Sequence, residues 1–138
     1  MSRPVISASL RTAVHERAHS CCEYCRIGDF DPFFPHEVDH IIALQHGGRS
    51  DLHNLALACM QCNRAKGTNF TSFDPETRRQ TPLFDPRRDQ WSDHFRLDGP
   101  RLVALTAIGR TTLKLLNIGD EDREQTRRLL WQDGRYPD

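Results

Sequence analysis

Four cysteines form two Cys-x2-Cys pairs, Cys22 with Cys25 and Cys59 with Cys62. Two thiolates at this spacing can reach one ion from a tight turn, and two such turns complete a tetrahedral four-thiolate zinc site. Thiol redox chemistry needs only one such motif next to a βαβ pattern, and cysteines that merely pack would not repeat the spacing. Because four thiolates leave no coordination position for water or substrate, the zinc ion is predicted to be structural.

Several polar residues lie between the cysteine pairs or next to them. A purely structural zinc site does not need these residues. Asp39 and His40 fall inside an apolar stretch, Asn54 precedes a second one, and Asn63 directly follows Cys62. Each has an ordinary interpretation when taken alone, since a single histidine in a strand is usually a surface or core residue and asparagine is common in turns. Their joint presence in this frame indicates a functional site.

Short elements are expected to position these residues. The apolar pattern predicts a helix at about 9–19, strands at 36–44 and 54–58, and a helix at 60–69. A loop with two glycines, residues 45–51, connects the two strands. Strand alternation puts Val38 on one face and Asp39 and Ile41 on the other.

The order of these residues resembles the HNH nucleases, a family with the ββα-metal fold. The resemblance covers residues 22–67 and rests on both cysteine pairs, Glu37-Val38-Asp39-His40, Gly47-Gly48, Asp51-x2-Asn54-Leu55 and Cys62-Asn63-x2-Lys66-Gly67. It implies an α+β fold with a small ββα-metal core in the subtype stapled by a four-cysteine zinc site. The segments around Phe84 and Gly109 are similar to C-terminal regions of small bacterial HNH proteins, which names no activity.

The same resemblance implies a role for each polar residue. His40 would be the general base that activates water, and Asn54 would brace the loop between the strands and orient the His40 ring. Asp39 and Asn63 would bind the catalytic divalent cation. A carboxylate and an amide oxygen leave positions for water and phosphate, which suits Mg²⁺ or Mn²⁺.

Candidate contacts to a DNA substrate are basic side chains near this site and beyond it. Lys66 and Arg64 would lie on the helix near the scissile phosphate, and His46 in the glycine loop is a further candidate; solvated side chains are the alternative for each. Further candidates are two arginine pairs and three helical arginines, namely Arg78, Arg79, Arg87, Arg88, Arg123, Arg127 and Arg128. The alternative is a set of charged, solvated faces.

The chain is expected to divide into three segments. Residues 1–72 would form the nuclease core with its N-terminal helix and zinc knuckles. Residues 73–94 would form a Pro/Arg-rich arm, either an extended linker or a wrapping arm, rather than a packed element. Residues 95–138 would form a hairpin around Asp98-Gly99, followed by helices at 107–117 and 120–132, packed on the same domain.

Length and composition limit the possible classes. A chain of 138 residues suits one domain with its appendages. No stretch approaches the roughly 20 apolar residues of a membrane-spanning helix. The 19 basic side chains balance 19 acidic ones, and a net charge of zero neither indicates nor excludes nucleic-acid binding. The N-terminus lacks an apolar signal run, which predicts a cytoplasmic protein whose cysteines bind metal rather than form disulfides. Cys21, the fifth cysteine, is predicted to be a bystander.

Two function classes remain open. One is a metal-dependent endonuclease that hydrolyses DNA phosphodiester bonds. The other is a zinc-stapled nucleic-acid-binding or protein-interaction module without catalysis. A binding module needs the cysteines but has no need of Asp39, His40 and Asn63, so the three together favour the enzyme.

Overall fold

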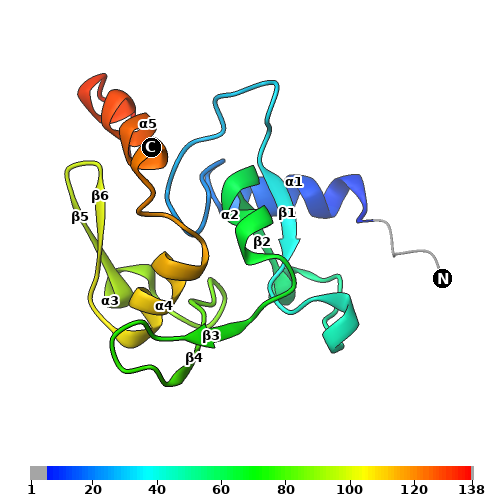
Figure 1. The fold of residues 1–138 in the computed structure, drawn as a ribbon. Coiled ribbons are helices and arrows are strands. Elements are labelled where there is room, and N and C mark those ends of the chain that lie inside the picture. Colours follow the sequence, from blue (N-terminus) through cyan, green and yellow to red (C-terminus); the bar gives the residue numbers. More distant parts are fainter. Residues whose placement is uncertain (1–5, 138) are drawn as a thin grey trace.

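The computed structural model describes residues 6–137 (Figure 1), so that the first five residues of the predicted segment 1–72 and the last residue of 95–138 lie outside the described residues. The helices and strands are α1 (Ala8–Arg17), β1 (Glu37–His40), β2 (Leu55–Ala58), α2 (Met60–Lys66), β3 (Thr71–Phe73), β4 (Gln80–Pro82), α3 (Trp91–His94), β5 (Phe95–Asp98), β6 (Arg101–Ala104), α4 (Ala107–Leu115) and α5 (Glu121–Gln132). The 3-10 turns η1 (Leu44–His46) and η2 (Leu52–Asn54) lie between β1 and β2. No helix in the described part of the chain is long and apolar enough to cross a bilayer.

The centre of the fold is an antiparallel hairpin between two helices. β1 pairs with β2 in a two-stranded sheet, with His40 opposite Leu55. β2 is fully buried, and α2 begins directly after it because the Cys59 side chain caps the helix by accepting from the Cys62 amide. The α+β class and the strand–strand–helix order predicted from the sequence are confirmed.

Helix α1 packs on the side of the hairpin away from α2 (Figure 1). Val14 of α1 is fully buried with Leu55 and Leu57 of β2, and Val38 of β1 packs against the same cluster. The Arg17 side chain also donates to the carbonyls of Leu52 and Leu55. Because successive strand residues face opposite sides, Asp39 and Glu37 of β1 face α2 while Val38 and His40 face α1.

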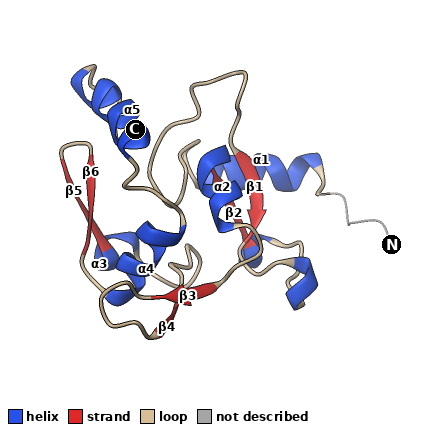
Figure 2. Ribbon diagram, in the orientation of Figure 1, coloured by secondary structure: helices blue, strands red, loops and turns tan. Residues whose placement is uncertain are grey.

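The segment predicted as an extended, unpacked arm contains a hairpin, so that part of the prediction is wrong (Figure 2). β3 and β4 pair antiparallel, with Thr71 opposite Pro82. Leu83 and Phe84, which follow directly, are buried in the same core as the knuckle cysteines. Strands of three residues are too short to show alternation, and the prolines and arginines around them dominated the pattern.

Asp74 closes the turn of this hairpin from a buried position. Its carboxylate accepts from the Glu76 amide and the Thr77 hydroxyl, and both its oxygens accept from the Arg110 guanidinium of α4, at 3.0 and 2.9 Å. The Arg110 hydrogen bonds hold the pKa of Asp74 well below its usual range. One carboxylate therefore joins the β3–β4 turn to the C-terminal region.

We expect Asp74→Asn to lower the melting temperature by several degrees at neutral pH, because a neutral amide cannot replace the ion pair. The folded-state pKa lies below that of an unfolded aspartate, about 3.9. The stabilisation is therefore complete above about pH 4 and is lost as the pH falls further, towards the folded-state value. Thermal melts of both proteins should converge below about pH 4; a difference that is constant from pH 3 to pH 7 would contradict this origin.

The C-terminal elements pack onto the cysteine knuckles. β5 and β6 form the predicted hairpin, and α4 and α5 follow as predicted. The hydroxyl of Tyr136 donates to the Cys25 carbonyl, and the indole of Trp91 donates to the Tyr24 carbonyl. One continuous core thus runs from the first knuckle to Tyr136.

Several arginines predicted as DNA contacts are internal structural residues instead. Arg123 and Arg127 of α5 are buried, and Arg127 donates to the carbonyls of Pro100 and Ile118. Arg87 forms an ion pair with the largely buried Glu23. These three guanidinium groups serve backbone carbonyls, thiols and a carboxylate, so the predicted basic DNA surface is wrong at these positions.

Candidate active site and metal centre

The four knuckle cysteines converge on one point. The Sγ atoms of Cys22, Cys25, Cys59 and Cys62 lie within 4.8 Å of one another, and all four residues are buried. The two knuckles repeat the same turn, in which the amide of the second cysteine donates to the sulfur of the first. Sulfurs at about 2.3 Å from a tetrahedral zinc ion are about 3.8 Å apart, and the Cys25 and Cys59 sulfurs are 3.8 Å apart. The four thiols are therefore positioned to hold a metal ion.

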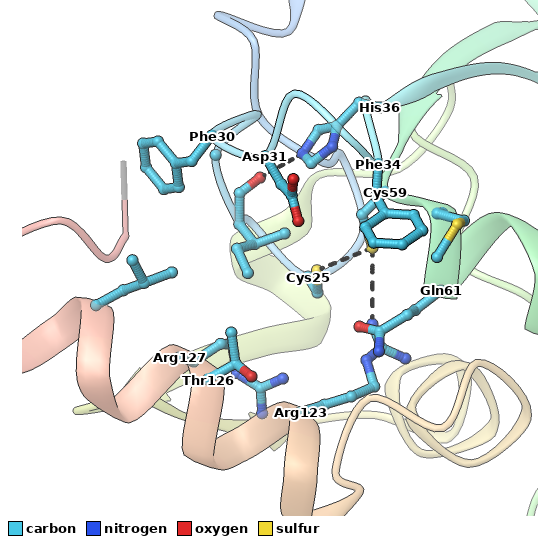
Figure 3. Close-up of a pocket in the computed structure, with 14 residues that line it drawn as sticks. Cys25, Phe30, Asp31, Phe34, His36, Cys59, Gln61, Arg123, Thr126 and Arg127 are labelled. Atoms are coloured by element: carbon cyan, nitrogen blue, oxygen red, sulfur yellow. Dashed lines mark hydrogen bonds between the residues drawn. The ribbon is translucent and has the colours of Figure 1, made fainter.

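Arg123 of α5 stands against these thiols (Figure 3). Its guanidinium lies 2.9 Å from the Cys62 sulfur and 3.8 Å from the Cys59 sulfur, and it also donates to the Leu116 carbonyl. Burial acts to lower the pKa of Arg123, but the adjacent Cys62 and Cys25 thiols outweigh it and raise the pKa. Four thiolates around a divalent ion carry a net double negative charge, so this fixed cation compensates part of it.

Sequence reasoning missed Arg123 because an arginine in a strongly polar helix has the pattern of an exposed residue. Cys21 is also buried, with its sulfur 3.4 Å from the His19 carbonyl, and it is outside the four-thiol group. The choice of Cys22 over Cys21 as the partner of Cys25 is thus borne out by the geometry.

A separate cavity of about 670 Å³ runs beside β1. All four residues of β1 line it, from both faces of the strand, and the lining residues include none from β2. The cavity therefore opens along the unpaired edge of β1, between α1 and α2. Asp39, His40 and Asn63 all line it, so the edge position brings together residues that project from opposite strand faces.

Asp39 is held by a buried lysine. The Lys66 ammonium lies 3.0 Å from the Asp39 carboxylate and donates to the His40 carbonyl at 3.1 Å. The Lys66 side chain is only 2% exposed, and that of Asp39 is 11% exposed. Burial raises the pKa of the Asp39 carboxyl above its usual value, although Lys66 acts in the opposite direction. The predicted phosphate contact by Lys66 does not fit this buried position.

Asn63 lies one helical turn before Lys66 on the same face of α2. Its amide donates to the Glu37 carboxylate at 3.3 Å, and Glu37 shares the strand face of Asp39. Glu37, Asp39 and Asn63 therefore bring two carboxylates and an amide to the lining of one cavity. No role was predicted for Glu37 from the sequence. Its position two residues before Asp39 indicates that both side chains lie on the same face of the strand.

His40 contacts the glycine loop through Ser50. The His40 Nε2 atom and the Ser50 hydroxyl are 2.8 Å apart. Ser50 is half-buried and lies at the end of the loop between the strands. A serine in a polar loop has no pattern that separates it from ordinary turn chemistry, so sequence reasoning could not select it.

Asn54 braces this loop, as expected, but it does so through the backbone. Its Oδ1 accepts from the Ile42 amide, and its Nδ2 donates to the carbonyls of Ile42 and Arg49, all at 2.9 Å. Gly48 is required here, because a Cβ would lie 1.8 Å from the Ile42 carbonyl oxygen. Asn54 thus fixes Arg49, the neighbour of Ser50, and acts on His40 through Ser50.

Two other predicted substrate contacts are not among the residues that line the cavity. Arg64 is exposed on α2, and His46 of η1 packs edge-on against Phe70 with ring centroids 5.4 Å apart. The structure therefore brings together Asp39, His40 and Asn63, supports them through Asn54 and Lys66, and leaves Arg64 and His46 outside.

Comparison with known proteins agrees with this arrangement. A family model described as HNH endonuclease matches residues 22–69, which span both knuckles, the β1–β2 hairpin and α2. No curated protein and no solved structure matches the chain. The matched range, the strand–strand–helix unit and the four converging thiols coincide, so that residues 22–69 carry a match to the HNH endonuclease family and a structure consistent with its ββα-metal fold.

Proposed function

We propose that the chain is a metal-dependent endonuclease that hydrolyses DNA phosphodiester bonds in the cavity beside β1. The observation that carries the proposal is that Asp39, His40 and Asn63 line one cavity, although they come from two strand faces and a helix. A cavity with a base and two oxygen ligands meets the needs of in-line attack by water on a phosphodiester.

His40 acts as the general base in this reaction. His40 Nε2 lies 2.8 Å from the Ser50 hydroxyl oxygen. In the tautomer that suits this role, Nε2–H donates to Ser50 and Nδ1 is the basic nitrogen. His40 takes a proton from a water molecule, the water oxygen bonds to phosphorus, and the bond from phosphorus to the leaving oxygen breaks. Asn54 holds the loop in place, and Ser50 keeps the imidazole at a fixed angle to the incoming water.

Asp39 and Asn63 hold the catalytic divalent cation, and Glu37 lies next to them. A set of hard oxygen ligands with open positions suits Mg²⁺ or Mn²⁺. When bound, such a cation stabilises negative charge on the phosphate and on the leaving oxygen. Lys66 fixes the Asp39 carboxylate and the His40 backbone at the same time, which sets the spacing between ligand and base.

The four thiols hold a structural zinc ion. Soft thiolate ligands favour this ion, and a complete four-sulfur shell gives it no position for a substrate. Arg123 compensates its negative shell. The two metal sites thus have separate tasks: the thiolate site maintains the fold and the oxygen site performs the reaction.

One observation favours a second candidate function, a zinc-stapled binding module without catalysis. The Asp39 carboxylate already has an internal cation, because the Lys66 ammonium lies 3.0 Å away. A carboxylate that is neutralised in this way has less need of a metal ion. The two candidates differ in whether a divalent cation binds next to Lys66.

The test is cleavage of supercoiled plasmid by the purified protein with Mg²⁺ or Mn²⁺, and again with EDTA. We expect relaxed or linear DNA only with the metal, and loss of cleavage in Asp39→Asn, which keeps the size of the side chain next to Lys66. Asp98→Asn, at an exposed position of the β5–β6 hairpin, is the matched control and should cleave normally. Binding to plasmid without any cutting would support the second candidate.

A further inference from the structure

Helix α1 contributes a cation to the candidate active site. Arg11 lines the cavity together with Asp39, His40 and Asn63, although it lies before the segment that matches the HNH family model. The helix was expected only to be amphipathic, and the sequence analysis assigned no functional residue to it. Ile6, which directly precedes the helix cap, lines the same cavity.

The position of Arg11 is fixed from the protein side. Val14 is fully buried against β2, and Leu10 packs against the same cluster. Arg17 ties the last turn of α1 to the backbone around η2. Because α1 is packed or hydrogen-bonded on both sides of Arg11, the backbone that carries the guanidinium is a fixed helix rather than a loop.

Arg11 differs from the other cations near the site because its guanidinium has no partner within the described residues. Its exposed side chain forms no ion pair or hydrogen bond with any residue in the described range 6–137. Lys66 is buried and committed to Asp39, and Arg64 does not line the cavity. Arg11 is therefore the one arginine or lysine among the residues that line the cavity, which it shares with His40, whose side chain projects from the strand face that α1 covers.

We propose that Arg11 binds the phosphate of the DNA substrate in the cavity, opposite the oxygen ligands of Asp39 and Asn63. This assignment rests on the proposed nuclease function. A planar guanidinium can donate two parallel hydrogen bonds to phosphate oxygens, which orients the phosphorus as well as attracting the charge. In this arrangement the phosphate lies between the Arg11 guanidinium and the metal ligands Asp39 and Asn63. His40 of β1 lies between these two groups.

The first test measures DNA binding without metal, by fluorescence anisotropy of a labelled 20-base-pair duplex in EDTA. Loss of one phosphate contact lowers the slope of log affinity against log salt by about 1. From 50 to 200 mM salt, the wild-type affinity should therefore fall about threefold more than that of Arg11→Gln. Arg11→Lys should keep the wild-type slope. Arg96→Gln, at an exposed position of β5, is the matched control with the same change of charge.

The second test measures cleavage with Mg²⁺. We expect Arg11→Gln to lower kcat/KM about 100-fold, with partial recovery in Arg11→Lys. Three results would each overturn the assignment: an unchanged salt slope in Arg11→Gln, an equal loss of slope in Arg96→Gln, or no DNA binding by the wild-type protein in EDTA. If the wild type binds DNA through Arg11 but does not cleave it with metal, the proposed nuclease function fails and the phosphate contact stands.

Discussion

His40→Ala is expected to abolish plasmid cleavage while the fold and the bound zinc remain. A positioned general base contributes about 10²–10⁴-fold to a rate, so kcat should fall about 1,000-fold or below detection. The fold should persist because the Lys66 ammonium bonds the His40 backbone carbonyl, which alanine keeps. Initial rates on supercoiled plasmid, thermal melts and zinc content of the same preparation check the three parts.

Ser50 provides a graded control for this prediction. If Ser50 orients the His40 ring, Ser50→Ala should lower kcat about 10-fold with little change in KM, and Ser50→Thr, which keeps the hydroxyl, should recover most of the loss. Ser72→Ala, a half-buried serine of β3, should leave the rate unchanged. Near wild-type cleavage by His40→Ala would remove His40 from the role of base, whatever the outcome at Ser50.

The part of the fold predicted from the sequence is the part in which local pattern and long-range constraint agree. The two cysteine pairs require residues near 22 and 59 to meet, the apolar stretches between them pair as a hairpin, and the second cysteine pair begins the helix. The β5–β6 hairpin was predicted for a similar reason, since Asp98-Gly99 lies between two alternating runs. In both cases the turn residues and the apolar period indicate the same structure.

The errors concern charged residues, for which composition does not show the environment. Arg123, Arg127 and Lys66 have the pattern of exposed residues, yet all three are buried with backbone carbonyls, thiols or a carboxylate as partners. Such burial depends on partners that are distant in sequence. Arg123, for example, meets Cys62 only because α5 returns to the knuckles. A helical period cannot reveal a partner of this kind.

The site was predicted as a set of residues but not as a shape. The alternation of β1 placed Asp39 and His40 on opposite faces, and the unpaired edge of the strand is what lets both line one cavity. Ser50 and Arg11 were missed because neither carries a local signal. Ser50 was identified only by its contact with His40, and Arg11 only by its place in the lining of the cavity.

Cys59→Ser is expected to lose the zinc ion and, with it, the folded state. The binding free energy of a structural zinc site reaches about 10–16 kcal/mol, whereas the whole folding free energy of a domain is about 5–15 kcal/mol. Loss of the ion is therefore large enough to unfold the chain. Cys59 is also the cap of α2, so its sulfur serves the helix as well as the metal. Elemental analysis and circular dichroism should show no zinc and no cooperative melt.

Cys21→Ser is the matched control, because Cys21 is buried next to Cys22 but stands outside the four-thiol group. It should keep one zinc per chain and a cooperative melt.

Brief dialysis of the wild type against EDTA distinguishes the two metal sites. Two oxygen ligands hold Mg²⁺ weakly, since the ion keeps several waters, whereas thiolates hold zinc tightly. Cleavage should stop in EDTA and return with Mg²⁺ while zinc stays bound. Zinc lost together with the activity, or an unchanged melt in Cys59→Ser, would show that the four thiols do not hold the structural ion.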